Sequence, residues 1–347
     1  VRFGFVPKGA TSDPISDGID PDFSALDRTV IYALIARLDD RRRAGEVIPM
    51  TMQSFQSFWI DATGETGIGD NATALFPWWS FTKTIISICA FRLAERGEID
   101  VDALLRDRPY TLRQLLGHTA GVPDYGHISE YHAAVARQDT PWSREKLLDV
   151  AQSDTLKFTP GTGYAYSNIG YMFARDLLEQ TTDKDLSDLV ASEVCRPLGL
   201  ESVLLAKKQD DFAGVFWEAA KTYDPQWVYH GCLVGTCQDA ARALHGLVTG
   251  RLLKPDTLSD MLSARPISSA IPGRPWSDVS YAAGIASGQM SKAGRVIGHV
   301  GQGPFSVAGI YHFLDLKMPV TVACFADGTD VGVAEFEAQR LALHRQA

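Results

Sequence analysis

Segments with strand character lie near both ends of this chain, and a long helical stretch separates them. Between residues 47 and 69, β-branched and aromatic residues lie among glycines, which predicts two short strands joined by a turn. Four further strands are predicted after residue 279, at Tyr281–Ser287, Arg295–His299, Val307–Phe313 and Val320–Phe325. Residues 100–275 read instead as helical pieces broken by proline and glycine. This order favours one antiparallel sheet built from both chain ends, with a mainly helical lobe inserted between its halves.

Predicted helices flank the strands. Apolar residues recur at helical spacing from Ser24 to Arg43, and a second helix is predicted from about Ser80 to Glu95. A final helix, at about 333–343, carries Val333, Phe336 and Leu343 on one face. We therefore expect an α+β fold, with the antiparallel sheet flanked by helices.

The predicted domain organisation follows from these elements. Residues 1–23 hold three prolines and several aspartates and are expected to be an irregular arm. Residues 24–347 are expected to form a single domain. Its sheet lobe would comprise residues 24–99 and 276–347, and its helical lobe residues 100–275.

Composition narrows the partners that the chain can have. The formal net charge is -9, and the only arginine run, Arg41–Arg43, ends a predicted helix where cations complement the helix dipole. Since a nucleic-acid partner requires a concentrated positive face, none is expected. No apolar stretch reaches the roughly 18 residues that span a bilayer, so no integral membrane segment is expected. The sequence leaves the oligomeric state open.

The cysteines and the first residues bear on metal binding and compartment. Five scattered cysteines make no disulfide framework, and Cys232 and Cys237 lack the further ligands of a zinc site, so buried free thiols are expected. Such thiols weakly favour a reducing compartment. The chain begins without Met and without a secretory-leader pattern, which leaves both a cytoplasmic location and export with a removed leader open.

Ser80 and Lys83 form the first candidate for chemistry. A serine hydroxyl is a weak nucleophile and needs a base within hydrogen-bonding reach. Ser80-Phe-Thr-Lys83 puts both side chains on one face at the start of a predicted helix, beside backbone N–H donors. The surroundings are apolar, with Trp78 and Trp79 just before the serine, and desolvation lowers the pKa of a lysine. Lys83 is therefore expected to be able to accept the proton of Ser80.

The Ser-x-x-Lys spacing occurs a second time, at Ser143 and Lys146. Charged residues fill the first turn there, so Ser143 is interpreted as an ordinary helix N-cap. For Ser80 taken alone, the cap reading and the nucleophile reading both remain open.

Two further segments favour the nucleophile reading. A glycine-rich loop that leads into a helix carries Tyr166 and Asn168 in the pattern Tyr-x-Asn. Tyr166 could share or relay the proton of Ser80, and the Asn168 amide could hold Lys83 and a substrate carbonyl. His299-Val300-Gly301-Gln302 ends a predicted strand, where Gly301 would let a substrate backbone lie against the strand edge and His299 could donate to a substrate carboxylate or the tyrosine oxygen. Lys292-Ala293-Gly294 offers an alternative basic-x-Gly pattern, but it falls where a hairpin turn is needed.

In that order, Ser-x-x-Lys, Tyr-x-Asn and a basic-x-Gly strand resemble the three-part signature of the penicillin-recognising serine hydrolases. Tyrosine in the second part is similar to the branch of class C β-lactamases, DD-peptidases and related esterases. The resemblance extends to Leu115–Val122, which looks like the family segment "LLxHTSGL", to Phe158–Gly161, and to Arg196–Leu200, and it covers about residues 24–345. It implies a β-lactamase/transpeptidase-like fold.

The resemblance also implies a role for each candidate residue. Ser80 would be the nucleophile that forms an acyl-enzyme, with Lys83 and Tyr166 as the proton-transfer pair. Asn168 would orient substrate and lysine, and His299 with Gly301 would form the edge where substrate docks. The backbone N–H groups of Ser80 and Gln302 would hold the oxyanion. The segment around His118 is expected to have a structural role, at a corner of the chain. No metal or organic cofactor is implied.

The sequence departs from the β-lactamase pattern at His299, which replaces the lysine of Lys-Thr-Gly. Family members with histidine there more often resemble DD-peptidases, D-amino-acid peptidases or esterases. The expected activity is therefore hydrolysis of an amide or ester bond in a small molecule or short peptide, of the DD-peptidase or D-amino-acid peptidase type. A promiscuous carboxylesterase and a catalytically silent penicillin- or peptidoglycan-binding homologue are the alternatives. Trp78 and Trp79 would narrow the pocket or pack in the core.

Overall fold

The computed structural model describes residues 54–69 and 71–346. The predicted arm at residues 1–23 and the predicted helix at residues 24–43 lie outside the described residues. The strands are β1 (Phe55–Asp61), β2 (Thr66–Ile68), β3 (Phe76–Pro77), β4 (Leu204–Ala206), β5 (Cys232–Gly235), β6 (Arg265–Ser269), β7 (Asp278–Tyr281), β8 (Ala286–Gln289), β9 (Arg295–Gln302), β10 (Ser306–Phe313) and β11 (Val320–Asp327).

The helices gather in the middle of the described sequence and at its end. They are α2 (Phe81–Glu95), α3 (Leu112–Leu116), α4 (Ser129–Ala136), α5 (Arg144–Val150), α6 (Asn168–Thr182), α7 (Leu186–Val190), α8 (Arg196–Leu198), α9 (Cys237–Val248), α10 (Pro255–Met261) and α11 (Val331–His344). A π-helical turn, η2 (Ala191–Cys195), joins α7 to α8. The 3-10 turns are η3 (Gln209–Phe212), η4 (Glu218–Thr222), η5 (Pro225–Trp227) and η6 (Ser291–Ala293).

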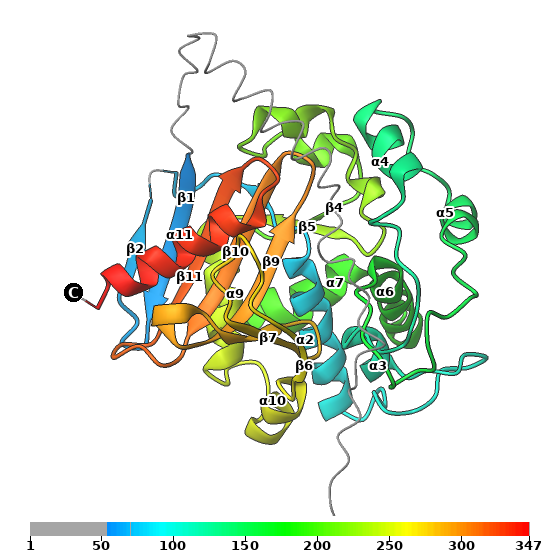
Figure 1. The fold of residues 1–347 in the computed structure, drawn as a ribbon, viewed down its shortest axis with the longest axis horizontal. Helices are drawn as coiled ribbons and strands as arrows, with labels where there is room; N and C mark the ends of the chain where they lie inside the picture. Colours follow the sequence, from blue (N-terminus) through cyan, green and yellow to red (C-terminus); the bar gives the residue numbers. More distant parts are fainter. Residues whose placement is uncertain (1–53, 70, 347) are drawn as a thin grey trace, which may run out of the picture. The chain divides into compact units, whose positions relative to one another are not determined.

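Eight strands form one antiparallel sheet in the order β2-β1-β11-β10-β9-β8-β7-β6 (Figure 1). The early strand β1 pairs with the late strand β11 along its whole length, from Phe55↔Ala326 to Asp61↔Val320. Strands from both ends of the described chain therefore meet in one sheet, and the predicted α+β fold class is confirmed. A second, three-stranded sheet has the order β3-β5-β4 and leads the chain into α2.

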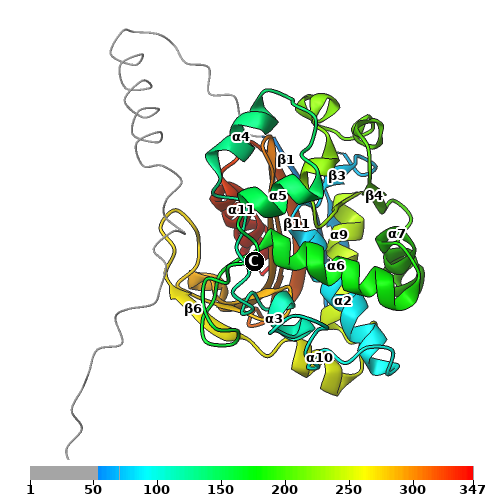
Figure 2. The same ribbon diagram turned by 90° about the vertical axis from the view of Figure 1, so that its right-hand side faces the viewer.

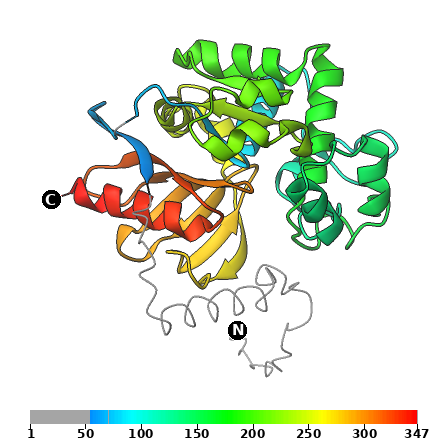
Figure 3. The same cartoon turned by 90° about the horizontal axis from the view of Figure 1, so that it is seen from above.

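Helices cover both faces of the large sheet. On β10, Tyr311 and Phe313 pack in one cluster with Ala338 and Ala342 of α11, whereas Ile310 belongs to the cluster that contains α2 and α9. Because alternate residues of a strand point to opposite faces, α11 lies on one side of the sheet and α9 and α2 on the other (Figure 3). Every residue of β10 is buried, as expected for a strand covered on both faces.

Helix α2 is the central helix of the described fold, and twelve of its fifteen residues are buried. A helix that is apolar on all sides lies inside a domain rather than on its surface. It contacts β9 on one side and α6, α7 and α10 on others. The side that carries α3 to α6 faces the viewer in Figure 2. The first turn of α2 is thus enclosed between the sheet and the helical region.

Three details differ from the sequence-based expectations. The expected strand at Tyr281–Ser287 is a hairpin, with β7 and β8 joined through a turn in which Gly284 has a φ of +73°. Strand β6 joins the sheet although it precedes residue 276, the expected start of the second half of the sheet lobe. Phe336 of α11 is 47% exposed, and the buried face of that helix carries small residues, Ala334, Ala338 and Ala342.

Two further findings concern the thiols and membrane spanning. All five cysteines are free and buried: Cys89, Cys195, Cys232, Cys237 and Cys324. This confirms the expectation of buried free thiols. Within residues 54–69 and 71–346, no helix combines the length and apolar character that crossing a bilayer requires.

Candidate active site

Ser80 lies at the N-cap of α2, directly after the strand β3 and the pair Trp78–Trp79. Trp79 has a φ of 45°, in the left-handed region that bulky residues rarely adopt. Its indole N–H donates to Ser306 Oγ at 3.0 Å, and its ring packs edge-on against Phe305. Both tryptophans are buried, so aromatic packing fixes the turn that presents Ser80.

Lys83 Nζ lies 2.9 Å from Ser80 Oγ and 2.7 Å from Asn168 Oδ1. The lysine side chain is fully buried. Burial lowers the pKa of Lys83 to about 7, and the negative charge of Asp124 partly opposes that shift. Near neutral pH a large fraction of Lys83 is therefore an uncharged amine that can accept a proton.

Tyr166 is the second side chain that contacts Ser80 Oγ. Its hydroxyl donates to Ser80 Oγ at 2.9 Å, and Lys83 Nζ lies 5.0 Å from the centre of its ring. Burial raises the pKa of Tyr166, and its hydrogen bond to Ser80 opposes the rise. The phenol is therefore protonated at neutral pH and acts as a donor to Ser80. Ser80 and Tyr166 are only half-buried, so solvent reaches this side of the cluster.

Asn168 is held by Asp124, a residue that sequence reasoning missed. Asp124 Oδ1 accepts from the Asn168 backbone N–H at 2.7 Å, and Asp124 Oδ2 accepts from Asn168 Nδ2 at 3.2 Å. With its NH2 group turned toward the carboxylate, Asn168 presents Oδ1 to Lys83. Asp124 thus sets the orientation of the amide, and its negative charge also raises the pKa of Lys83.

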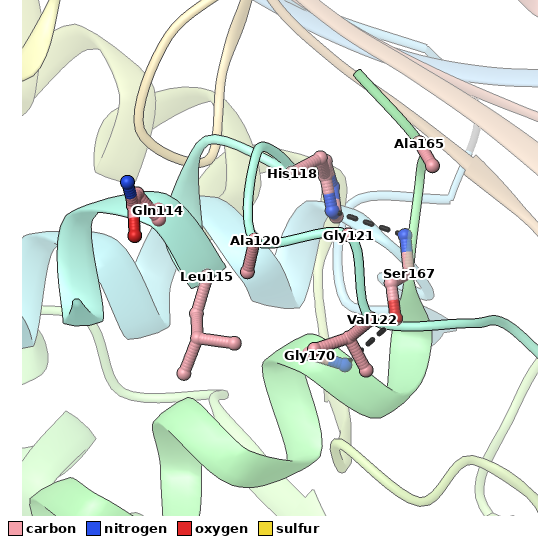
Figure 4. Close-up of a pocket in the computed structure, with 9 residues that line it drawn as sticks. All are labelled: Gln114, Leu115, His118, Ala120, Gly121, Val122, Ala165, Ser167 and Gly170. Carbon is pink, nitrogen blue, oxygen red and sulfur yellow. Dashed lines mark hydrogen bonds between the residues drawn. The ribbon is translucent and has the colours of Figure 1, made fainter. Parts of the chain in front are cut away.

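The loop that carries Tyr166 and Asn168 rests on a corner at His118 (Figure 4). His118 has a φ of 56°, and its Nδ1 accepts from the Ser167 backbone N–H at 3.1 Å. Ser167 Oγ accepts from Gly170 N at 2.8 Å and caps α6. The pocket that His118 and Ser167 help to line, drawn in Figure 4, has no room for a water molecule. His118 therefore supports the loop between Tyr166 and Asn168 by accepting a backbone hydrogen bond.

His299 is buried in β9 and binds within the protein rather than to Ser80 or Tyr166. Its Nε2 lies 2.8 Å from Tyr281 Oη, and its Nδ1 lies 2.5 Å from the Val300 carbonyl oxygen. Because a carbonyl only accepts, the proton is on Nδ1, and Nε2 accepts from Tyr281. Burial lowers the pKa of His299 to about 3, so the ring is neutral. In this arrangement it has no N–H free for a substrate, in contrast to the donor role expected from the sequence.

Gly301 and Gln302 complete β9 beside the start of α2. A Cβ on Gly301 would lie 2.7 Å from the Trp78 carbonyl oxygen, so only glycine lets the strand pass so close to the residues before Ser80. Gln302 ends the strand with an exposed side chain, whose Nε2 donates to Thr329 O at 2.8 Å. The pairing of β8 with β9 ends at Ala286↔Gly298. From there to Gln302, β9 pairs with β10 alone.

The structure also brings an unexpected histidine to the lysine. His230, just before β5, places Nε2 3.1 Å from Lys83 Nζ, although 147 residues separate the two in sequence. Ser143, in contrast, accepts from Lys146 N at 3.2 Å and caps α5, which confirms its reading as an N-cap. Among the described residues, no three His, Cys, Asp or Glu side chains lie together as a metal ion would require.

Three comparisons with known proteins bear on this site. Residues 56–346 match the family model described as Beta-lactamase. The chain is 28% identical to a D-aminopeptidase of Gluconobacter oxydans over 190 residues, which are 53% of this chain and 36% of that protein. It is 29% identical to penicillin-binding protein 4* of Bacillus subtilis over 140 residues, 37% of this chain and 30% of that protein. The matched part is thus about a third of the length of these relatives.

Among solved structures, the chain is similar to the D-amino acid amidase of Ochrobactrum anthropi SV3 in complex with L-phenylalanine. The TM-score is 0.69 at 19% sequence identity, and the match covers 91% of this chain and 99% of the amidase. At this identity the similarity establishes the fold.

Proposed function

This chain belongs to the beta-lactamase family, and from that premise we propose that it is an active-site-serine hydrolase that cleaves amide bonds through an acyl-enzyme on Ser80. The observation that carries the proposal is the contact of one hydroxyl with both proton carriers. Ser80 Oγ lies 2.9 Å from Lys83 Nζ and 2.9 Å from Tyr166 Oη. These are the distances over which a nucleophile and its base share a proton.

In the first step, Ser80 Oγ attacks the carbonyl carbon of the substrate while its proton moves to the Lys83 amine. A lysine whose pKa is about 7 suits this task, because a general base works best when its pKa lies near the working pH. The carbonyl oxygen gains negative charge, which the backbone N–H groups of Ser80 and Gln302 are proposed to stabilise.

In the second step, the C–N bond breaks and the leaving nitrogen needs a proton. Tyr166, protonated and hydrogen-bonded to Ser80, delivers it, and the Lys83 ammonium returns a proton to the tyrosine. Water then attacks the acyl carbon with the same groups acting in reverse, which frees Ser80. These reaction steps use only groups of this chain, the substrate and water.

We propose amides of D-amino acids, or short peptides that contain them, as the substrate class. Support comes from the names of the similar proteins, a D-aminopeptidase and a D-amino acid amidase. His299 in place of the lysine of β-lactamases supports the same class rather than β-lactam hydrolysis. A carboxylesterase would differ in turning over short p-nitrophenyl esters rapidly with little action on D-amino-acid amides.

The experiment that tests the proposal is intact-mass analysis after treatment with a fluorophosphonate. We expect one adduct on the wild type and none on Ser80→Ala, whereas Ser143→Ala, which alters the other Ser-x-x-Lys serine, should be labelled like the wild type. An unlabelled wild type, or a labelled Ser80→Ala, would contradict the proposal. D-alanine amide, L-alanine amide, benzylpenicillin and p-nitrophenyl acetate, assayed side by side, then identify the substrate class.

A further inference from the structure

His230 is a buried histidine that the scheme above does not use. It is 2% exposed and lies between the turn η5 and the strand β5. The next residue, Gly231, has a φ of +97°, and a Cβ there would lie within 3.1–3.4 Å of Leu205, Leu186 and Arg175. The backbone after His230 is therefore held in a tight turn that fixes where the imidazole points.

The imidazole completes a set of three partners around the lysine nitrogen. Lys83 Nζ lies 2.9 Å from Ser80 Oγ, 2.7 Å from Asn168 Oδ1 and 3.1 Å from His230 Nε2. An ammonium has three N–H bonds, and each of them finds an acceptor here. When the lysine is an amine, Asn168 and His230 still accept its two N–H bonds. The remaining position, now a lone pair, then faces the hydroxyl that it must deprotonate.

This geometry requires a neutral histidine with its proton on Nδ1. His230 Nδ1 is buried and has no hydrogen-bond partner in the structure. A buried N–H without a partner destabilises the fold. If the ring of His230 served packing alone, an apolar ring at this position would make the protein more stable. The one nitrogen of His230 that is engaged is the nitrogen that faces Lys83.

Several titratable groups surround the Lys83–His230 pair. They are Asp124 and His118 after α3, Tyr166 before α6, Tyr171 and Arg175 in α6, Cys232 in β5, and His299 in β9. Burial comes first in lowering the pKa of His230 well below its ordinary value, and the charges of Lys83 and Arg175 act in the same direction. His230 therefore stays an acceptor over the whole range in which Lys83 titrates.

We propose that His230 is a positioning residue that, together with Asn168, fixes the rotation of the Lys83 nitrogen so that its lone pair points at Ser80 Oγ. This inference rests on the proposed function, in which Lys83 is the base. Without the imidazole, the ammonium loses an acceptor, and hydrogen bonds to a charged group are stronger than those to a neutral one. Removing His230 should therefore favour the uncharged amine form of Lys83 but leave its lone pair poorly aligned with Ser80 Oγ.

The test measures the rate of fluorophosphonate labelling against pH in four proteins: the wild type, His230→Phe, His230→Gln and His230→Asn. Gln places its amide oxygen at about the depth of Nε2, whereas Asn reaches only the depth of Nδ1. In His230→Phe we expect the plateau rate to fall roughly tenfold or more. The acidic limb of the profile should move to lower pH by about half a unit or more. His230→Gln should restore both quantities to near wild-type values, and His230→Asn should not.

A second buried histidine provides the matched control. His312 hydrogen-bonds Thr321 in the sheet and takes no part in the site, so His312→Phe should label at the wild-type rate. The proposal is overturned if His230→Phe keeps the wild-type rate and limb, or if the Gln and Asn variants behave alike. If His230→Phe does not fold, the comparison of His230→Gln with His230→Asn tests the proposal instead. A wild type that is not labelled at all would instead overturn the proposed function.

Discussion

Lys83 is a titratable residue with no exposed surface, and its neighbours determine its protonation state. Burial disfavours the ammonium, while Asp124 favours it, and the pKa settles at about 7. Asn168 and His230 satisfy its N–H bonds, so the amine form loses no hydrogen bond to protein. Lys83 therefore changes its charge near neutral pH. Substitutions around it should shift the pH at which this change occurs.

The acidic limb of the labelling profile should lie near pH 7 in the wild type, because the reactive form of Lys83 exists above its pKa. Asp124→Asn removes the negative charge that raises this pKa, so the limb should shift to lower pH. The plateau rate should fall as well, since the Asn168 amide loses the carboxylate that orients it. Labelling rates between pH 5 and 9 measure both effects.

Asp102→Asn is the control for a change of net charge. Asp102 pairs with Arg113 on the surface, and its loss should leave the limb where it is in the wild type. If Asp124→Asn moves the limb upward, or not at all, the charge of Asp124 does not act on the base.

At this scale, sequence reasoning found the residues that lie in short motifs and missed those that do not. Ser80 and Lys83 share one helical turn, and Tyr166 and Asn168 are two residues apart, so local spacing indicated each pair. His230 and Asp124 are isolated in sequence and reach Lys83 and Asn168 only through the tertiary fold. The partners of His299 were also missed: Tyr281, a residue of β7, donates to its Nε2, and its Nδ1 donates to the Val300 carbonyl.

Among the elements, α11 carries one fully buried carboxylate, Glu335, that contacts the sheet. Glu335 is fully buried, and its Oε1 accepts from Trp276 Nε1 at 3.0 Å and from the Tyr311 hydroxyl at 2.5 Å. Arg274, in the loop between β6 and β7, forms an ion pair with it. The carboxylate thus joins the helix, the centre of the sheet and the β6–β7 loop.

Arg274→Met should destabilise the protein by about 3–5 kcal/mol, because it leaves the Glu335 charge buried without its partner. Adding Glu335→Gln should recover part of that loss, since the amide carries no charge and still offers an oxygen to Trp276 and Tyr311. Urea unfolding of the two variants and the wild type, followed by tryptophan fluorescence, measures this difference. A double variant no more stable than Arg274→Met would show that the charge is not the source of the cost.

The elements that sequence reasoning placed well are those with a long apolar pattern, such as α2, β10 and β11. It merged β7 and β8 because residues 282–286 contain no polar side chain and only Gly284 marks the turn. It overlooked β6 because this edge strand has no buried residue and therefore no alternating pattern. In α11 the large apolar residues suggested one face, yet the close approach of helix and sheet selects alanines.

At the scale of the whole described fold, the candidate site lies where the sheet meets the helical region. The β7–β8 turn is one of the contacts between them. Gly284 donates from its backbone N–H to Leu116 O at 3.0 Å and accepts from Thr84 Oγ1 at 2.6 Å. A Cβ on Gly284 would clash with Ser87 Oγ and lie 2.8 Å from the Lys83 carbonyl oxygen. Any side chain there would push the turn away from α2.

Gly284→Ala should cost about 2 kcal/mol or more, from backbone strain and from overpacking against α2. It should also slow Ser80 labelling, because the turn then no longer packs against the start of α2, where Ser80 and Lys83 lie. Gly250→Ala is the matched control: its φ of +71° is nearly the same, but no atom lies within 4 Å of the added carbon. Equal losses of stability in thermal melts of the two variants would mean that the contact with α2 contributes nothing.

Because every cysteine is buried, the reactivity of the thiols reports how often the structure around each of them opens. Since Cys232 and Cys324 are fully buried, an alkylating reagent can reach them only when a segment opens, and the rate of their reaction measures how often that happens. Cys232 lies in β5 two residues after His230, whereas Cys324 lies within β11 in the large sheet. Mass mapping of which thiol reacts first would therefore distinguish local opening around the candidate site from opening of the large sheet.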